Sequence, residues 1–139
     1  MYLLDTNVVS ELRKTKPDRQ VKRWADSVAV PSLYLSAMTV LELETGVLRI
    51  ERRDAMQGAV MRRWMDEHVL PAFADRVLAI DTVVALRCAR LHVPDRIAHG
   101  DALIAATALV HGLTMVTRNT ADFEPSGVAL LNPWAGGTR

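Results

Sequence analysis

The sequence predicts an α/β fold, a three-layer α/β/α sandwich around a mostly parallel central sheet, in one domain that spans residues 1–139. Two observations lead to this prediction. Short apolar runs that can form strands alternate with longer segments whose apolar residues recur at helical spacing, which is typical of parallel sheets covered by helices on both faces. The chain length fits one domain, and the 50% apolar content is enough to build a core without disulfides.

The strands are predicted from short apolar runs bounded by turn-forming or capping residues. Tyr2–Leu4 ends directly at Asp5, and Leu33–Ser36 follows Pro31 and alternates in polarity. A strand pattern also resumes after Pro71. The strands are therefore expected at residues 2–4, 33–36, 77–80, 114–117 and 128–131.

The helices are predicted from apolar residues that recur three or four positions apart. Asp5 and the two residues after it can cap the first helix, and Asp81 or Thr82 can cap a later one. Pro71 is expected to stop the helix before it, and Gly112 is expected to end the last one. The helices are expected around residues 8–12, 21–24, 38–50, 54–69, 82–92 and 101–112.

The overall charge leaves the class of partner open. Seventeen Lys and Arg against sixteen Asp and Glu give a net charge of +1, so the chain lacks the surplus of proteins that hold nucleic acid mainly by neutralising phosphates. Basic residues crowd two stretches, 13–23 and 49–63, and the plain interpretation of each is a solvated helix face.

Apolar stretches and cysteine content indicate the compartment. The stretch Ala102–Val110 is far shorter than a membrane span, and Met1–Leu4 runs straight into Asp5, so we expect neither a transmembrane helix nor a signal peptide. Cys88 is the only cysteine, cannot form an internal disulfide and is expected to be buried. These features predict a cytoplasmic protein with no membrane partner.

Four acidic residues lie where predicted strands end or helices begin, namely Asp5, Glu42, Asp101 and Asp122. The carboxyl ends of parallel strands and the starts of the following helices converge on one edge of a sheet, where such folds place their ligand sites. Each acid also has an ordinary explanation: Asp5 and Asp101 as helix caps, Asp122 in a turn and Glu42 facing water. Four such positions together are harder to explain as independent caps.

Closely packed carboxylates repel one another, so a cluster of them predicts a bound cation. The hard oxygen ligands favour Mg²⁺, for which Mn²⁺ can substitute, and the four histidines show no zinc-binding spacing. His99, two residues before Asp101, is interpreted as a loop residue rather than a proton carrier. Metal held by carboxylates can activate water and neutralise a phosphate, which is the chemistry of phosphodiester hydrolysis.

The segments that carry these acids resemble a known family. They read Leu4-Asp5-Thr6-Asn7, Glu42-Leu43-Glu44-Thr45-Gly46, Asp101-Ala102-Leu103-Ile104-Ala105-Ala106-Thr107 and Thr117-Arg118-Asn119-Thr120-Ala121-Asp122-Phe123. Together they resemble a PIN domain of the VapC type, the toxin half of VapBC toxin–antitoxin pairs, with the FitB-like branch as one possibility. The likeness covers almost the whole chain.

By that resemblance the acidic quartet of the family falls on Asp5, Glu42, Asp101 and Asp122. Their supports would be the hydroxyl or amide side chains of Thr6, Asn7, Thr117 and Asn119. Glu44 is an alternative to Glu42 as the site residue. It lies two residues later and so projects from another side of the same helix, and the following Gly46 favours Glu42. Many relatives carry a further acid where this chain has Asn119, which leaves open whether one or two metal ions bind.

The resemblance implies a Mg²⁺-dependent endoribonuclease with an RNA substrate. It also implies a cognate antitoxin that covers the site, a homodimer, and operator DNA bound only indirectly through the antitoxin. An antitoxin helix needs an apolar groove, and for each residue that can supply one, core packing is the ordinary alternative. These residues are Val8, Val9, Leu12, Val21, Trp24, Met56, Val60 and Trp64. Arg118 can meet an RNA phosphate or remain an exposed loop charge.

Two other classes of function compete with the nuclease. A catalytically weak PIN-fold binding module would only pair with a DNA-binding antitoxin to regulate transcription, but it would have no use for four repelling carboxylates. A phosphoacceptor receiver domain would need a lysine late in the chain, whereas the last one here is Lys22. Cleavage of DNA instead of RNA stays open, since metal and phosphate chemistry alone does not distinguish the two sugars.

Overall fold

A computed structural model describes residues 1–135 and contains a five-stranded sheet in the order β3-β2-β1-β4-β5. Every neighbouring pair of strands is parallel. The strands are β1 (Tyr2–Leu4), β2 (Leu33–Ser36), β3 (Val77–Leu78), β4 (Thr114–Val116) and β5 (Leu130–Leu131). The predicted α/β class and parallel sheet are therefore confirmed, while the last four residues of the predicted domain lie outside the described residues.

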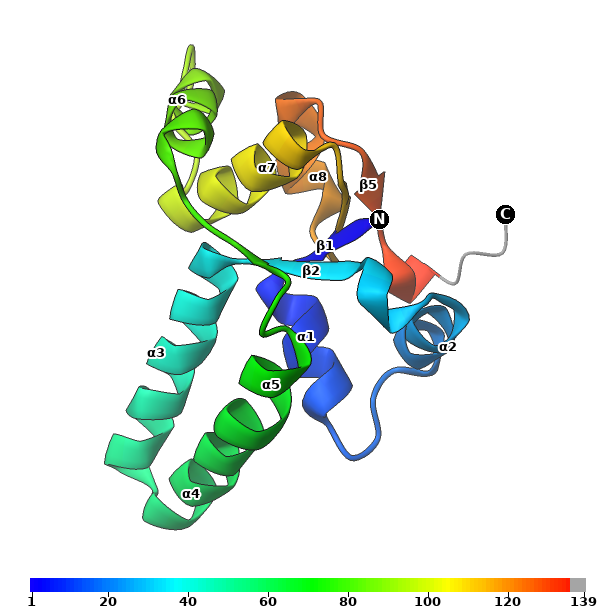
Figure 1. The fold of residues 1–139 in the computed structure, drawn as a ribbon, viewed down its shortest axis with the longest axis vertical. Coiled ribbons are helices and arrows are strands. Elements are labelled where there is room, and N and C mark those ends of the chain that lie inside the picture. The colour runs from blue at the N-terminus through cyan, green and yellow to red at the C-terminus, as the bar shows by residue number, and fades with distance from the viewer. Residues whose placement is uncertain (136–139) are drawn as a thin grey trace.

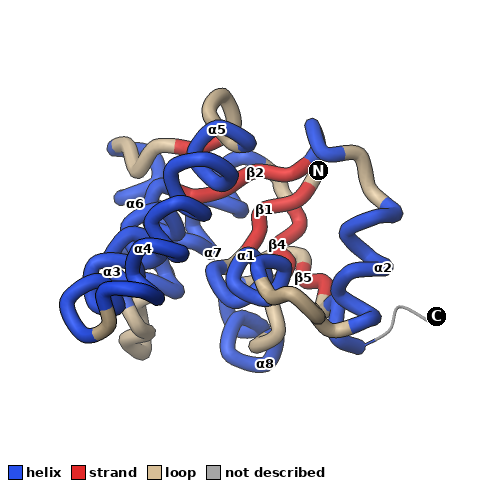
Figure 2. The backbone as a smooth tube through the Cα atoms, turned by 90° about the horizontal axis from the view of Figure 1, so that it is seen from below, coloured by secondary structure: helices blue, strands red, loops and turns tan. Residues whose placement is uncertain are grey.

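Helices cover both faces of this sheet (Figures 1 and 2). They are α1 (Thr6–Arg13), α2 (Arg19–Ser27), α3 (Ala37–Arg53), α4 (Ala55–Trp64), α5 (Leu70–Ala72), α6 (Thr82–Leu91), α7 (His99–His111) and α8 (Thr120–Phe123). The helices α7 and α8 pack on one face, and α1 and α3 pack on the other. Figure 1 shows α6 outside α7, and α3 with α4 running away from the end of β2.

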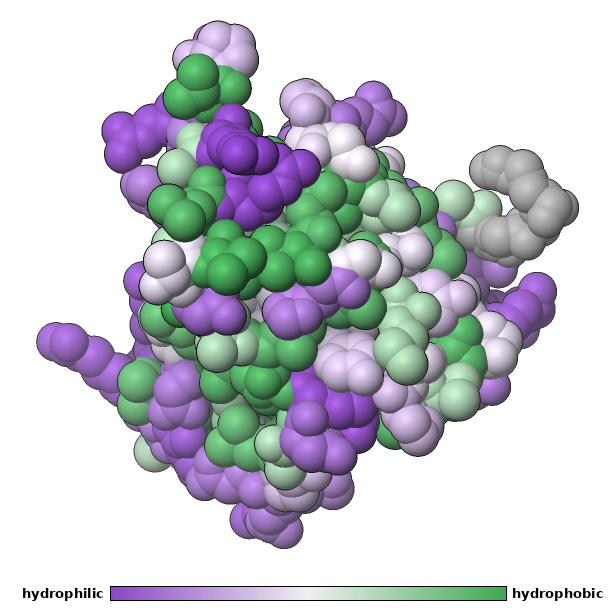
Figure 3. Space-filling view, turned by 45° about the horizontal axis from the view of Figure 1, so that its top comes forward, coloured by the Kyte–Doolittle hydropathy of each residue, from purple (hydrophilic) through white to green (hydrophobic). Residues whose placement is uncertain are grey.

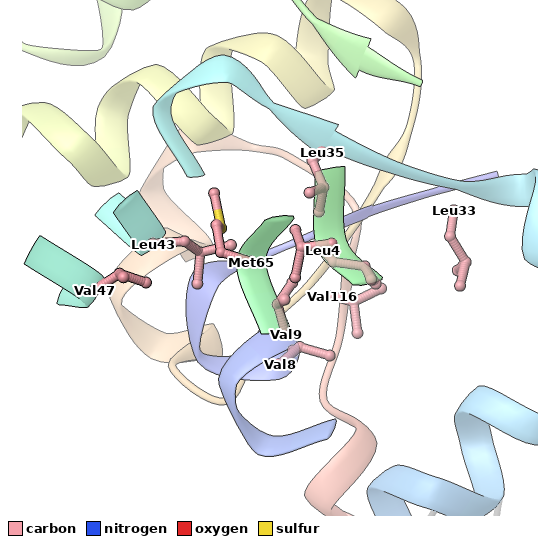
Figure 4. Packing of buried hydrophobic residues seen from close by; sticks show 10 residues of the cluster. Leu4, Val8, Val9, Leu33, Leu35, Leu43, Val47, Met65 and Val116 are labelled. Carbon is pink, nitrogen blue, oxygen red and sulfur yellow. The ribbon is translucent and has the colours of Figure 1, made fainter. Parts of the chain in front are cut away.

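Alternating side chains of the central strand β1 enter two different cores. Leu4 packs with residues of α1, α3 and the segment after α4, and Figure 4 shows these side chains converging on it. Leu3, its neighbour on the opposite face, packs with Ile104 of α7 and Phe123 of α8. Both leucines are almost fully buried, so a shift of β1 by one residue would exchange the two cores. This packing fixes where β1 ends, and with it the position of Asp5.

Three boundaries differ from the sequence prediction. Pro71 does not stop the preceding helix: a π-helical turn, Met65–Val69, leads into the short α5, where the proline occupies the first turn and needs no amide donor. The last long helix, α7, begins at His99, so Asp101 lies inside its first turn and is not its cap. The strands β3 and β5 each contain only two residues.

The helical hairpin of α3 and α4 depends on one glycine and one arginine. Gly58 lies so close to α3 that a Cβ built on it would stand 2.4 Å from the Cα of Glu51. Arg62 of α4 donates two hydrogen bonds to Glu44, at 2.8 and 2.9 Å, and two to Glu51, each at 3.2 Å. The hydrogen bonds from Arg62 lower the pKa of the Glu44 carboxyl.

Cys88 is buried, as predicted, and burial raises the pKa of its thiol. In residues 1–135, no helix has both the length and the apolar character that crossing a bilayer requires.

Candidate active site

The four predicted site acids reach one edge of the sheet by different routes. Asp5 directly follows β1 and is the N-cap of α1. Glu42 lies in the second turn of α3, the helix that follows β2, and Asp122 lies in α8, which follows β4. Because β2 and β4 are the two neighbours of β1, the segments after all three strands adjoin one another. Asp101 comes to this edge from the first turn of α7.

Asp5 is the most firmly held of the four. Asp5 is only 5% exposed. The backbone amide of Thr6 donates a hydrogen bond to Asp5 Oδ1 at 2.8 Å, and the Thr117 hydroxyl donates one to Asp5 Oδ2 at 2.7 Å. The backbone amide of Asn119 in turn donates to the Thr117 hydroxyl oxygen at 3.1 Å. Both carboxylate oxygens of Asp5 are therefore oriented by donors from two separate segments of the chain.

Glu42 reaches the same place from α3. The hydroxyl of Thr6 donates a hydrogen bond to Glu42 Oε1, so one threonine contacts Asp5 through its amide and Glu42 through its side chain. The other oxygen, Oε2, lies against Gly100, where a Cβ would stand only 2.6 Å from it. Glu42 thus sits between the start of α1 and the residue that precedes Asp101.

The charges of neighbouring carboxylates act on Asp5 and on Asp101. Burial raises the pKa of Asp5, the hydrogen bonds from Thr117 and Thr6 oppose that rise, and the charge of Glu42 adds to it. Burial also raises the pKa of Asp101, and the charges of Asp5 and Asp122 raise it further. The negative charges of Asp5 and Asp122 therefore both disfavour ionisation of Asp101.

Gly46 favoured Glu42 over Glu44 as the site residue, and the structure shows that the two side chains have different surroundings. Glu44 points to the other side of α3, where Arg62 of α4 binds both of its oxygens. Glu42 instead accepts from Thr6 next to Asp5. Two positions along a helix differ by about 200° around its axis, which is why neighbouring glutamates reach opposite surroundings.

The chemistry of this donor set fits a hard divalent cation. The available ligands are carboxylate oxygens, and Asn7, two residues after Asp5, has a buried side-chain oxygen with no hydrogen-bond donor within residues 1–135. In that part of the chain, no three His, Cys, Asp or Glu side chains already surround a common point as metal ligands.

One contact near the site and the local structure around two residues were not anticipated from the sequence. Gly100 contacts Glu42, and its only sequence signal is its place directly before Asp101. Asp122 lies in the short helix α8, which was expected to be a turn, and it borders a cavity of about 220 Å³ together with Arg90 and Ser126. His99, interpreted as a loop residue, begins α7, and Arg96 lies 3.0 Å from its Nε2.

Thr117 and Asn119 were predicted to support the site, and Arg118 was predicted to lie beside it. Asn119 contributes its backbone amide to Thr117, rather than its side chain. Arg118 does not turn to the carboxylates, because its guanidinium lies over the ring of Trp134, 5.1 Å from the ring centre. Its positive charge also lowers the pKa of Glu11, after the larger effects of hydrogen bonds from Asp18 and Lys14.

Comparisons with known proteins agree with one another. The family model described as PIN domain matches residues 2–124. The chain is 40% identical to VapC ribonuclease Y4jK of Sinorhizobium fredii, over 96% of this chain and 98% of that protein. It is also 40% identical to toxin FitB of Neisseria gonorrhoeae, over 96% and 99%. The crystal structure of FitAcB from Neisseria gonorrhoeae superposes with a TM-score of 0.88 at 40% identity, covering 96% of this chain and 99% of that one.

Proposed function

The chain belongs to the PIN-domain family, in its VapC- and FitB-like branch of toxins, and from that premise we propose that it is a Mg²⁺-dependent endoribonuclease neutralised by a cognate antitoxin. The observation that carries this proposal is that Thr6 links Glu42 to the surroundings of Asp5 beyond the carboxyl ends of neighbouring parallel strands, while the charge of Asp5 acts on Asp101. Carboxylates that lie close together repel one another and are stabilised by a cation, and a cation among them suits phosphodiester chemistry.

The proposed metal ligands are Asp5, Glu42, Asp101 and Asp122, with Thr6, Asn7, Thr117 and Asn119 as supports. Mg²⁺, or Mn²⁺ in its place, supplies positive charge that neutralises the scissile phosphate and makes a water molecule more acidic. Asn119 is neutral where a further acid would help to bind a second metal ion. The number of ions bound therefore depends on how many oxygen ligands residues 117–122 contribute.

The protein's own contribution is positioning. Thr6 and Thr117 hold the two oxygens of Asp5 in fixed directions before any ligand arrives. The Thr6 hydroxyl ties Glu42 to the same point, which limits the side-chain freedom that would otherwise be lost on binding. Burial of Asp5 strengthens its attraction for a cation, because fewer water molecules screen the charge.

An antitoxin helix is proposed to dock in an apolar groove beside α1. A cavity of about 180 Å³ there is lined by several apolar side chains, among them Val9, Leu12 and Trp64. The groove predicted from the sequence needs correction, because Val8 and Val21 are fully buried in the core and cannot contact a partner. The cationic Arg13 at the edge of the cavity would suit an acidic residue of the antitoxin.

A homodimer is the second proposed assembly. Large apolar side chains stay exposed on α3, where Leu41 is 56% and Leu48 is 53% exposed, and on α6, where Leu86 is 67% exposed. Figure 3 shows apolar residues gathered on the face that carries α6 and α7. Exposed apolar patches of this kind mark sites of protein association. Operator DNA would be bound through the antitoxin of such an assembly and not by this chain directly.

The proposal is tested by cleavage of cellular RNA with purified protein in Mg²⁺, in Mn²⁺ and in EDTA. We expect cleavage only with a divalent cation, and none by the Asp5→Asn or Glu42→Gln variants. Two matched controls exist within the chain. Asp54 is also an N-cap, so Asp54→Asn repeats the change of Asp5→Asn away from the site, and Glu44→Gln repeats Glu42→Gln on the other side of α3.

Both controls should cleave RNA at the rate of the parent protein once circular dichroism shows that they are folded. Cleavage that persists in EDTA, or that survives Asp5→Asn, would contradict the assignment. A folded parent protein that binds its antitoxin and cleaves neither RNA nor DNA would favour the alternative, a binding module that regulates transcription.

A further inference from the structure

Gly46 has no explanation inside the folded chain. It lies in the middle of α3, where glycine weakens a helix relative to alanine. Its backbone is helical, so a side chain would be unstrained, and a Cβ built there would meet no atom within 4 Å. Gly58, in contrast, is required by the close approach of α4 to α3. An open helical glycine of this kind suits the close approach of something outside the chain.

Helical geometry places Gly46 on a line that starts in the acidic site. Residues 4, 7 and 11 positions after Glu42 return to within about 40° of its direction around the helix axis. They are Gly46, Arg49 and Arg53, which we call the α3 arginine line. Figure 1 shows α3 running away from the end of β2, so this line leads outward from the carboxylates.

The two arginines of this line are available to a ligand. Arg49 and Arg53 are exposed, and neither forms an ion pair within residues 1–135. The arginines of the facing helix differ, since Arg62 is paired with three acids and Arg63 with Glu67. Arg53 lies in the last turn of α3, where the negative end of the helix dipole favours a cation. This explanation does not cover Arg49, which lies before that turn.

We propose that the α3 arginine line binds the sugar–phosphate backbone of single-stranded RNA next to the scissile bond, an inference that rests on the proposed ribonuclease function. An acidic site repels a polyanion, and a net charge of +1 provides no general attraction, so local cations must hold the strand. Arg49 lies about 10 Å along the axis from Glu42, and Arg53 about 6 Å further, which suits contacts with separate phosphates. Gly46, which lies between Glu42 and Arg49 on α3, lets the ribose pass close to the helix.

The test measures binding of a short, fluorescently labelled single-stranded RNA by proteins that all carry Asp5→Asn, so that no cleavage occurs. Each phosphate contact with single strands contributes about 0.7 to the slope of log Kd against log salt concentration. Loss of both arginines in Arg49→Ala/Arg53→Ala should therefore reduce the ratio of Kd at about 200 mM salt to Kd at about 50 mM salt roughly sevenfold. The matched control Arg52→Ala/Arg63→Ala removes the same charge from other helix faces and should change that ratio little.

Substitution of Gly46 provides a second, independent test of the proposal. Gly46→Gln should raise the Tm by about 2 to 3 °C, because the helix gains a better helix former, and it should still weaken RNA binding at least fivefold. Higher stability with lower affinity is a combination that a purely structural glycine would not give. Light scattering of the same variant must show an unchanged oligomeric state, since a shift would assign Gly46 to contact with a second copy and overturn the proposal.

The remaining outcomes separate this inference from the function on which it rests. If the parent protein cleaves RNA with Mg²⁺ while Arg49→Ala/Arg53→Ala keeps the parent salt dependence, the function stands and the arginine line is refuted. If those substitutions weaken antitoxin binding and leave RNA binding unchanged, the line belongs to the antitoxin interface and the proposal is again refuted. If the parent protein neither cleaves nor binds RNA, both proposals fail together.

Discussion

Substitution of Gly100 by alanine should impair catalysis without impairing stability. The new Cβ would lie 2.6 Å from Glu42 Oε2, whereas ordinary contacts begin at 3.4 Å, so the carboxylate must retreat by about 0.8 Å. The obstructing atom is the end of a flexible side chain, so the fold can absorb the change at little free-energy cost. Misplacement of a reacting group by about 1 Å can cost about 100-fold in rate, and we expect a fall of that size in kcat for Gly100→Ala.

The assay is cleavage of a fluorogenic RNA in Mg²⁺ together with the Tm of each protein. Gly100→Ala should keep the parent Tm within about 2 °C, because alanine is also a better helix former in the first turn of α7. Addition of Glu42→Gln to Gly100→Ala should cause little further loss, since both substitutions act on the same carboxylate. A Gly100→Ala protein with the parent kcat would refute the assignment of Glu42 as a site residue held against this glycine.

Three further predictions concern stability. Gly58→Ala should lower the free energy of unfolding by about 1 to 2 kcal/mol, because overpacking against the Glu51 backbone outweighs the gain in helix propensity. Its Tm should fall below that of Gly46→Ala, because the space around Gly46 is open. In EDTA, Asp5→Asn should be more stable than the parent at pH 7 but not below pH 3.8, which urea titrations at several pH values would show. The pKa of Asp5 is raised in the folded protein, so its contribution to stability is complete below its ordinary pKa and is lost as the pH rises through the raised value. Mg²⁺ at about 100 times its Kd should stabilise the parent by about 2.7 kcal/mol in thermal melts, and an equal gain for Asp5→Asn/Asp101→Asn would place the ion elsewhere.

The order of strands and helices, the parallel sheet and the positions of Asp5 and Asp101 near its edge could be derived from the sequence. These features depend on local patterns, such as the apolar run before Asp5 and the continuous apolar character of the helix after Asp101. Local errors arose where tertiary packing overrode a local signal. Pro71 is accommodated after a π-helical turn whose Met65 and Val69 are held in the core, and α8 forms because Phe123 packs against α7.

The different partners of Glu42 and Glu44 and the contact of Gly100 with Glu42 needed the tertiary structure, although Gly46 had already favoured Glu42 as the site residue. Glu42 accepts from Thr6, 36 positions earlier in the chain, and Glu44 binds Arg62, 18 positions later, so neither partner is visible in the local sequence. Sequence by itself determined which residue types lie at the ends of the strands, because periodicity and capping act over a few residues. Only the packing of separate segments decided which of these residues contact one another, because distances across a sheet depend on how all its elements fit together.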